Sequence, residues 1–117
     1  MNNEVTKEMI ENLKEDWESE SDYINSVIDQ TYEMETALIN DYISVKDTYD
    51  EAMTINWCFL DNTGLAKYYQ ALAELTSIMK RIEERIDLVK NTRDILKQLD
   101  SSASVWIEMS KLMKQMV

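Results

Sequence analysis

Apolar positions in the second half of the chain recur in alternating steps of three and four residues. This pattern is the heptad seam of a coiled-coil-like helix, with one polar residue, Arg93, inside it. Ile78, Ile95 and Leu99 widen the stripe toward the face that a bundle helix needs. A helix is therefore predicted over residues 65–99. The seam positions are Leu65, Tyr68, Leu72, Leu75, Met79, Ile82, Ile86, Val89, Arg93 and Leu96.

The first half of the chain shows a looser version of the same pattern. It predicts a helix over residues 22–59. The apolar face consists of Ile24, Val27, Ile28, Thr31, Met34, Leu38, Tyr42, Val45, Tyr49, Ala52 and Met53.

Shorter helical segments are expected at both ends, over residues 4–18 and 103–116. Ser19 or Ser21 could cap a new helix, but no residue there forbids one continuous helix. The serines in 100–104 suggest a second break, although the heptad phase almost survives across them. Both alternatives stay open at both places. The upstream stripe is Ile10, Leu13 and Trp17, and the downstream one is Trp106, Met109, Met113 and Met116.

The stretch LDNTG at 60–64 is the clearest break, because it holds the only glycine, with Asn62 and Thr63 as helix-cap candidates. One Gly and no Pro leave few tight turns for a sheet. Two long helices joined by a short loop must lie antiparallel. We therefore predict one all-α domain over 1–117, a long coiled-coil-like antiparallel hairpin with shorter terminal segments. Self-association could complete a bundle.

A turn near residue 62 makes the numbers of facing residues add to about 125. Two polar residues on the apolar faces then meet opposite charges at the same level, which removes the cost of burying them alone. The expected pairs are Asp41 with Arg81 or Arg85, and Arg93 with Asp29 or Glu33.

Acidic residues concentrate in the first half. Residues 1–60 hold fifteen acids and three bases, whereas 61–117 hold eight acids and nine bases. Residues 1–22 carry a net charge of −6 and would lie beside 101–117, whose net charge is only +1, so the N-terminal end is expected to stay unneutralised. An acidic stripe there follows steps of four and three on a solvent-facing side of the helix. Its members are Glu4, Glu8, Glu11, Glu15, Glu18 and Asp22.

The stripe allows two interpretations. A row of charges on a rigid helix imitates a phosphate backbone and would attract a basic groove. Alternatively, the stripe only keeps the protein in solution. A second candidate surface is rich in methionine, which is common at adaptable binding faces, although it could instead cap the hairpin or complete a bundle. That surface consists of Trp106, Met109, Leu112, Met113 and Met116.

Several chemistries are disfavoured. The chain has no His, the commonest general base and metal ligand, and one Gly cannot form a phosphate-binding loop. We expect no enzyme activity, no cofactor and no metal. The charge of −11 would repel nucleic acid, so direct nucleic-acid binding is not expected. Cys58, between Trp57 and Phe59, is expected to be a packed thiol in a reducing compartment.

The N-terminus does not resemble a signal peptide, and no apolar run approaches the ~20 residues of a membrane span. The composition resembles that of AT-rich bacterial or phage genomes, so we expect a cytoplasmic protein of a bacterium or a phage-infected host.

We predict a non-enzymatic, acidic protein-interaction module. Its most specific form is an inhibitor or mimic that binds a basic groove on a nucleic-acid-handling protein, as phage anti-defence or anti-CRISPR-like proteins do. The alternative is a helical-hairpin chaperone or an adaptor for assembly or secretion, working through the Met-rich face. A third possibility is a structural homo-oligomer.

Overall fold

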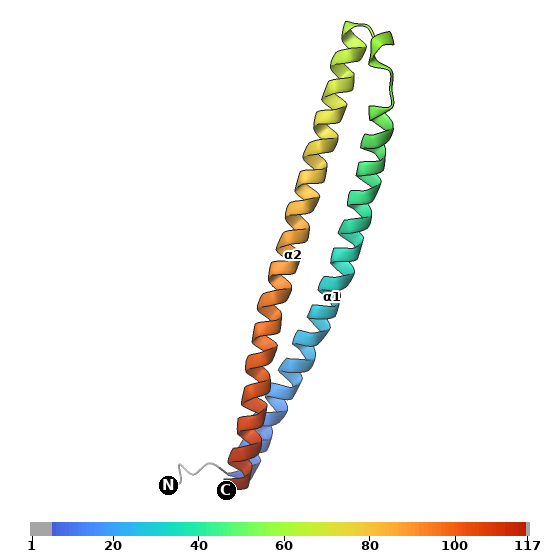
Figure 1. Cartoon of the computed structure of the whole chain (residues 1–117). Helices are drawn as coiled ribbons and strands as arrows, with labels where there is room; N and C mark the ends of the chain where they lie inside the picture. The colour runs from blue at the N-terminus through green and yellow to red at the C-terminus, as the bar shows by residue number, and fades with distance from the viewer. Residues whose placement is uncertain (1–5, 117) are drawn as a thin grey trace. The chain divides into compact units, whose positions relative to one another are not determined.

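The computed structural model describes residues 6–116, which form two long antiparallel helices joined by a short connection (Figure 1). Helix α1 spans Lys7–Met53, the 3₁₀ turn η1 spans Trp57–Phe59, and helix α2 spans Asn62–Met116. No strand occurs within residues 6–116. The predicted all-α hairpin is confirmed.

Each helix is continuous where the sequence left a break open. α1 passes through residues 18–22 and α2 through 99–104. The serines lie within α2, where their hydroxyls donate to the carbonyl groups four residues earlier, at 3.0 Å from Ser101 to Lys97 and 3.2 Å from Ser102 to Gln98. The four predicted helical segments are therefore parts of two helices.

The start of α2 is fixed by Asp61, not by the predicted caps Asn62 and Thr63, which lie inside the helix. The Asp61 carboxylate accepts a hydrogen bond from the amide of Gly64 at 2.7 Å, which satisfies one free donor of the first turn. A side chain at residue 64 would place its Cβ 3.1 Å from the accepting oxygen. Glycine therefore leaves room for the cap.

The connection between the helices occupies residues 54–61. α1 ends at Met53, six residues before the predicted end at residue 59, and the Thr54 hydroxyl donates to the Glu51 carbonyl at 2.6 Å. The Asn56 side chain then accepts a hydrogen bond from the Cys58 amide. Cys58 is exposed, so the predicted packed thiol is wrong: the short turn leaves no neighbouring helix to cover it.

The contacts divide the hairpin into two units, and each is described by itself. The terminal unit combines residues 1–32 and 91–117, and the turn unit comprises residues 33–90. In both, the seam lies between the helices. The turn unit's seam consists of Glu35, Leu38, Tyr42, Val45, Tyr49 and Ala52 of α1, with Leu65, Tyr68, Leu72, Leu75, Met79, Ile82, Ile86 and Val89 of α2.

The terminal unit's seam continues the same steps of three and four but contains smaller and more polar residues. Because those residues give a weak apolar signal, the sequence pattern favoured bulkier neighbours: Leu13 was expected inside, yet it is half exposed. The seam consists of Ile10, Lys14, Trp17, Ser21, Ile24, Ile28 and Thr31 of α1, with Arg93, Leu96, Asp100, Ala103, Ile107 and Ser110 of α2.

The predicted register is confirmed within each unit. Facing residue numbers add to 125, 124 and 125 for the pairs Glu11 with Lys114, Thr31 with Arg93, and Glu35 with Lys90.

Candidate interaction surfaces

Arg93 is the one guanidinium buried in the terminal unit's seam among the described residues. Its Nε donates to the Thr31 hydroxyl at 2.9 Å, and its Nη2 donates to the Thr31 carbonyl at 3.3 Å. The Thr31 hydroxyl in turn donates to the carbonyl of Ile28, so its lone pair is available to Arg93. The guanidinium also stacks over the Tyr32 ring, 3.7 Å from its centroid.

The predicted ion pairs do not form among the described residues. The register places the partners at the correct level, but their heptad positions put them outside the seam. Arg93 is held by Thr31 and Tyr32 instead. The remaining members of the predicted pairs are all exposed: Asp29, Glu33, Asp41, Arg81 and Arg85.

A second polar contact crosses the terminal unit's seam between Ser21 of α1 and Asp100 of α2. The Ser21 hydroxyl donates to the Asp100 carboxylate at 2.6 Å. The Asn25 amide donates to the same carboxylate oxygen at 3.2 Å and to the Ser21 carbonyl at 2.9 Å. These directional bonds fix the alignment of the two helices, since a shift by one turn would leave buried polar atoms unpaired.

The residues that directly follow each seam position form a polar flank of the terminal unit. In α1 they include most of the predicted acidic stripe. Glu4 lies outside the described residues. Glu11 is half-buried and accepts a hydrogen bond from the Lys114 ammonium of α2, and Lys14 lies 3.8 Å from Glu11 and 3.5 Å from Glu18.

The hydrogen bond from Lys114 holds the pKa of Glu11 below its ordinary value, and the charge of Lys14 acts in the same direction. The expectation that the N-terminal end stays unneutralised is therefore wrong at Glu11. Four lysines come together beside the stripe and line a shallow hollow. These are Lys7, Lys14, Lys111 and Lys114.

An acidic row remains on the polar flank. Its members are exposed and occupy every seventh position of α1, about 10 Å apart at 1.5 Å per residue. They belong to no ion pair among residues 6–116. The acidic row consists of Glu8, Glu15, Asp22 and Asp29.

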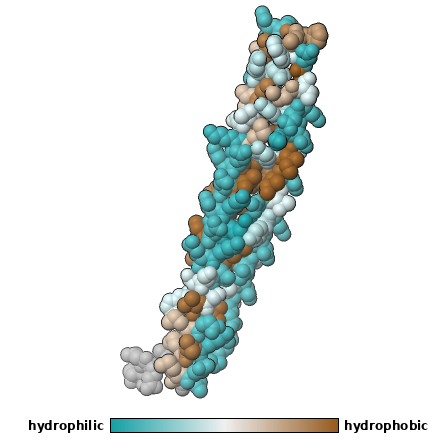
Figure 2. Space-filling view, in the orientation of Figure 1, coloured by the Kyte–Doolittle hydropathy of each residue, from teal (hydrophilic) through white to brown (hydrophobic). Residues whose placement is uncertain are grey.

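The residues that directly precede each seam position form the opposite side of the terminal unit. This side is mostly apolar, although the carboxylates of Asp16 and Glu20 also lie on it. We call it the apolar flank. Brown apolar patches interrupt the hydrophilic surface of the protein (Figure 2). The apolar flank consists of Met9, Leu13 and Tyr23 of α1, with Ile95, Leu99, Trp106, Met109, Met113 and Met116 of α2, all substantially exposed.

A groove of about 320 Å³ runs along the apolar flank between the two helices. Trp17 forms part of its lining and stacks on Trp106, with ring centroids 5.9 Å apart and planes inclined by 10°. The indole Nε1 of Trp17 is buried without a hydrogen-bond partner. Tyr23 and Leu99 line the same groove.

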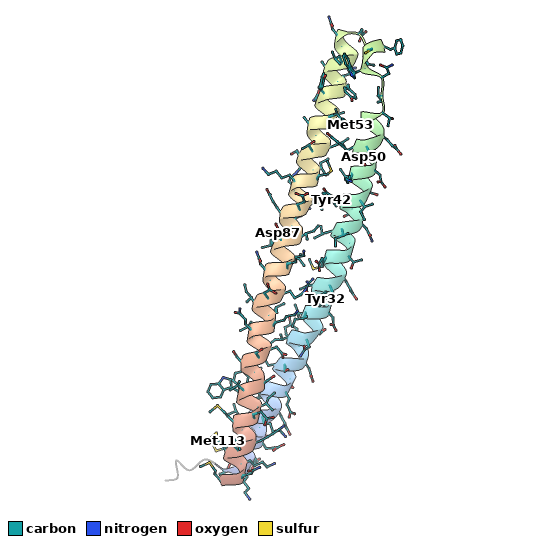
Figure 3. The ribbon with its side chains drawn as sticks, in the orientation of Figure 1. Tyr32, Tyr42, Asp50, Met53, Asp87 and Met113 are labelled. Carbon is teal, nitrogen blue, oxygen red and sulfur yellow. The ribbon has the colours of Figure 1, made fainter. Side chains whose placement is uncertain are left out.

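The structure places four predicted apolar site residues on this flank: Trp106, Met109, Met113 and Met116. Met113 lies near the end of α2 (Figure 3). Leu112, the fifth, lies on the side of α2 that points away from the seam and is 60% exposed. None of the five continues the seam, which passes through Ala103, Ile107 and Ser110.

The α1 part of the flank was missed, although a second apolar stripe one residue ahead of the seam was the available signal. The prediction used only the stripe nearest the seam phase and assigned Leu13 to the core. Tyr23 was not assigned to any surface, and it is 68% exposed.

The described residues contain no group of three or more Cys, Asp or Glu side chains arranged to hold a metal ion. No helix in residues 6–116 combines the length and the apolar character that crossing a membrane requires. Comparison of the chain with protein-family models, with curated proteins and with solved structures gives no match in any of the three.

Proposed function

We propose that this chain is a non-enzymatic protein-interaction module, a helical-hairpin adaptor or chaperone that binds helices of another protein through its apolar flank. The observation that carries the proposal is the heptad spacing of large exposed apolar side chains on that flank. Exposed apolar residues gathered on one side commonly mark an interaction surface. A stripe at heptad spacing fits a helix, whose own side chains recur at the same interval.

The methionines suit such a role. Met109, Met113 and Met116 are flexible and polarizable, so they can adapt to partner side chains of different shapes. Trp106 supplies a large anchor that is already oriented by its stacking on Trp17.

A second candidate function rests on the acidic row: an inhibitor that mimics nucleic acid, of the anti-defence or anti-CRISPR-like kind, and occupies a basic groove. The supporting observation is that these four carboxylates are exposed at regular intervals and form no ion pair within residues 6–116. Their spacing of about 10 Å is wider than the 3.4 Å rise between phosphates of one DNA strand. Lys14 and Lys114 also offset the carboxylates nearest to the row. The apolar flank is therefore the better supported surface.

The test is affinity capture from the native host's lysate, washed at low and at moderate salt. Wild type is compared with a flank variant, Trp106→Glu with Met113→Glu, and with a row variant, Glu8→Gln, Glu15→Gln, Asp22→Asn and Asp29→Asn. A matched control carries Val105→Glu and Leu112→Glu, since these residues are 58% and 60% exposed but lie on the outer side of α2.

The adaptor function predicts a partner that survives moderate salt, binds the row variant and the control, and is lost from the flank variant. A basic partner that is lost at moderate salt and from the row variant would instead establish the mimic, because surface electrostatic attraction is screened by salt. Capture that is insensitive to both variants would reject both functions.

A further inference from the structure

The chemistry of the apolar flank also points to a particular first occupant. Both helices contribute to the flank. Seven of its nine residues directly precede a seam position, and Met113 and Met116 continue the same heptad spacing. The flank therefore repeats with the same heptad interval as the seam that already joins α1 to α2. In a four-helix bundle, each helix uses two adjacent stripes of this kind, one for each neighbour. Within one copy, only the first stripe is covered.

The area of the flank is close to what a stable dimer needs. Nine large side chains are on average about half exposed, and a large side chain offers about 200 Å² when it is free. The flank thus presents about 900 Å², compared with about 800 Å² per partner in a standard interface.

The net charges of the two helices favour one packing arrangement of two copies over another. In the terminal unit, residues 7–32 of α1 carry eight acids and two lysines, a net charge of −6, whereas residues 91–116 of α2 carry four bases and three acids, a net charge of +1. Placing α1 of one copy against α1 of the other would bring two acidic helices together. Placing α1 against α2 of the other copy avoids this repulsion.

The turn unit supports the same arrangement. Asp41 of α1 directly precedes a seam position, and so does Arg85 of α2; both are exposed and have no ion-pair partner among the described residues. Their numbers add to 126, so the register of the hairpin, repeated between two copies, would bring Asp41 of one copy level with Arg85 of the other. Met34 and Leu88 lie on the same side and line an apolar groove there with Arg85.

We propose that a second copy of this chain occupies the apolar flank, with α1 of each copy packed antiparallel on α2 of the other, to give a symmetric four-helix bundle. Such an interface is self-complementary, because the same flank serves both copies. The inference rests on the proposed function in that the flank is taken as a helix-docking surface. The second copy is its resting occupant, which the helices of another protein would displace.

The experiment is light scattering of the full chain after size-exclusion chromatography, from about 1 to about 100 µM, with circular dichroism as a check on helicity. Wild type is expected at twice the chain mass of 13.8 kDa. Trp106→Glu with Met113→Glu should be monomeric, and the matched control Val105→Glu with Leu112→Glu should remain dimeric. A monomeric wild type, a larger assembly, or a dimer that tolerates the flank variant would overturn the proposal.

A charge exchange tests the arrangement independently at positions that are exposed in one copy. Asp41→Arg and Arg85→Asp should each raise the dimer dissociation constant several-fold, and the double variant should restore most of the loss. If the double variant has a dimer dissociation constant as high as those of the single variants, the α1-to-α2 arrangement is excluded. A wild-type monomer that still captures a salt-resistant partner through the flank would end this inference and leave the proposed function standing. A wild-type dimer that captures no salt-resistant partner through the flank would support this inference and reject the proposed function.

Discussion

The terminal unit and the turn unit share one heptad pattern, but they bury different kinds of residue. In the turn unit, α2 presents a row of Leu, Ile, Val and Met to α1. In the terminal unit, the seam includes Arg93, Asp100 and Ser110 of α2, and larger apolar side chains lie outside it. Apolar burial stabilises both units, since Ile82 and Val89 are buried in the turn unit and Ile10, Ile24, Ile28 and Ala103 in the terminal unit. The terminal unit adds directional polar contacts across its seam and leaves large apolar side chains exposed.

The largest effect is expected in the turn unit. Ile82 is buried in its seam, so Ile82→Ala should lower the free energy of unfolding by about 2–4 kcal/mol through lost burial and an unfilled cavity. Ile43→Ala, at a position that is 50% exposed, is the control and should change it by less than about 1 kcal/mol. Urea unfolding followed by circular dichroism at one protein concentration measures both. Equal losses would show that apolar burial does not distinguish these positions.

A smaller and more selective effect is expected at Arg93. Arg93→Ala removes the hydrogen bonds to Thr31 and the stacking on Tyr32, and should cost about 2 kcal/mol. Arg93→Leu should remain within about 1 kcal/mol of wild type, because a well-packed apolar residue can replace a buried charge. The same urea titration measures both variants. If leucine destabilises as much as alanine, the polar contacts contribute stability as well as alignment.

The smallest effects concern pH and have opposite signs in the two units. In the terminal unit, the hydrogen bond from Lys114 lowers the pKa of Glu11 below 4.5. A lowered folded-state pKa gives stability that is present above the unfolded value and is lost as the pH falls through the folded value. Thermal melts from pH 6 to 3 should therefore show a steeper loss for wild type than for Glu11→Gln. Parallel curves would mean that this contact adds nothing.

In the turn unit, a hydrogen bond from the Tyr42 hydroxyl to Glu83 raises the pKa of Tyr42 above 10.0, because ionisation would place two negative charges together. Tyr42 lies on α1 (Figure 3). A raised folded-state pKa gives stability that is present below pH 10 and is lost as the pH rises through the folded value. Tyr42→Phe is the matched control. In thermal melts at different pH values, it should remove the loss of stability at alkaline pH and leave the loss at acidic pH unchanged.

The amino-acid sequence alone predicts the fold class, the long hairpin, the turn-unit seam and the facing register, but it leaves open whether the terminal segments continue the two long helices. It predicts these features because one Gly and no Pro favour uninterrupted helices, and because large apolar residues at heptad spacing specify which face is buried. The register followed from the position of the turn alone, and Glu11 with Lys114 and Glu35 with Lys90 agree with it.

The packing of α1 against α2 selects which of two adjacent stripes lies inside the terminal unit, and the sequence pattern does not reveal this choice. The hydrophobicity of the sequence favours Trp106 and Met113 as buried residues, but the packing of α2 on α1 within the terminal unit buries the smaller Ala103 and Ser110 instead. The bulky residues are left outside as a consequence, and they form the candidate binding flank.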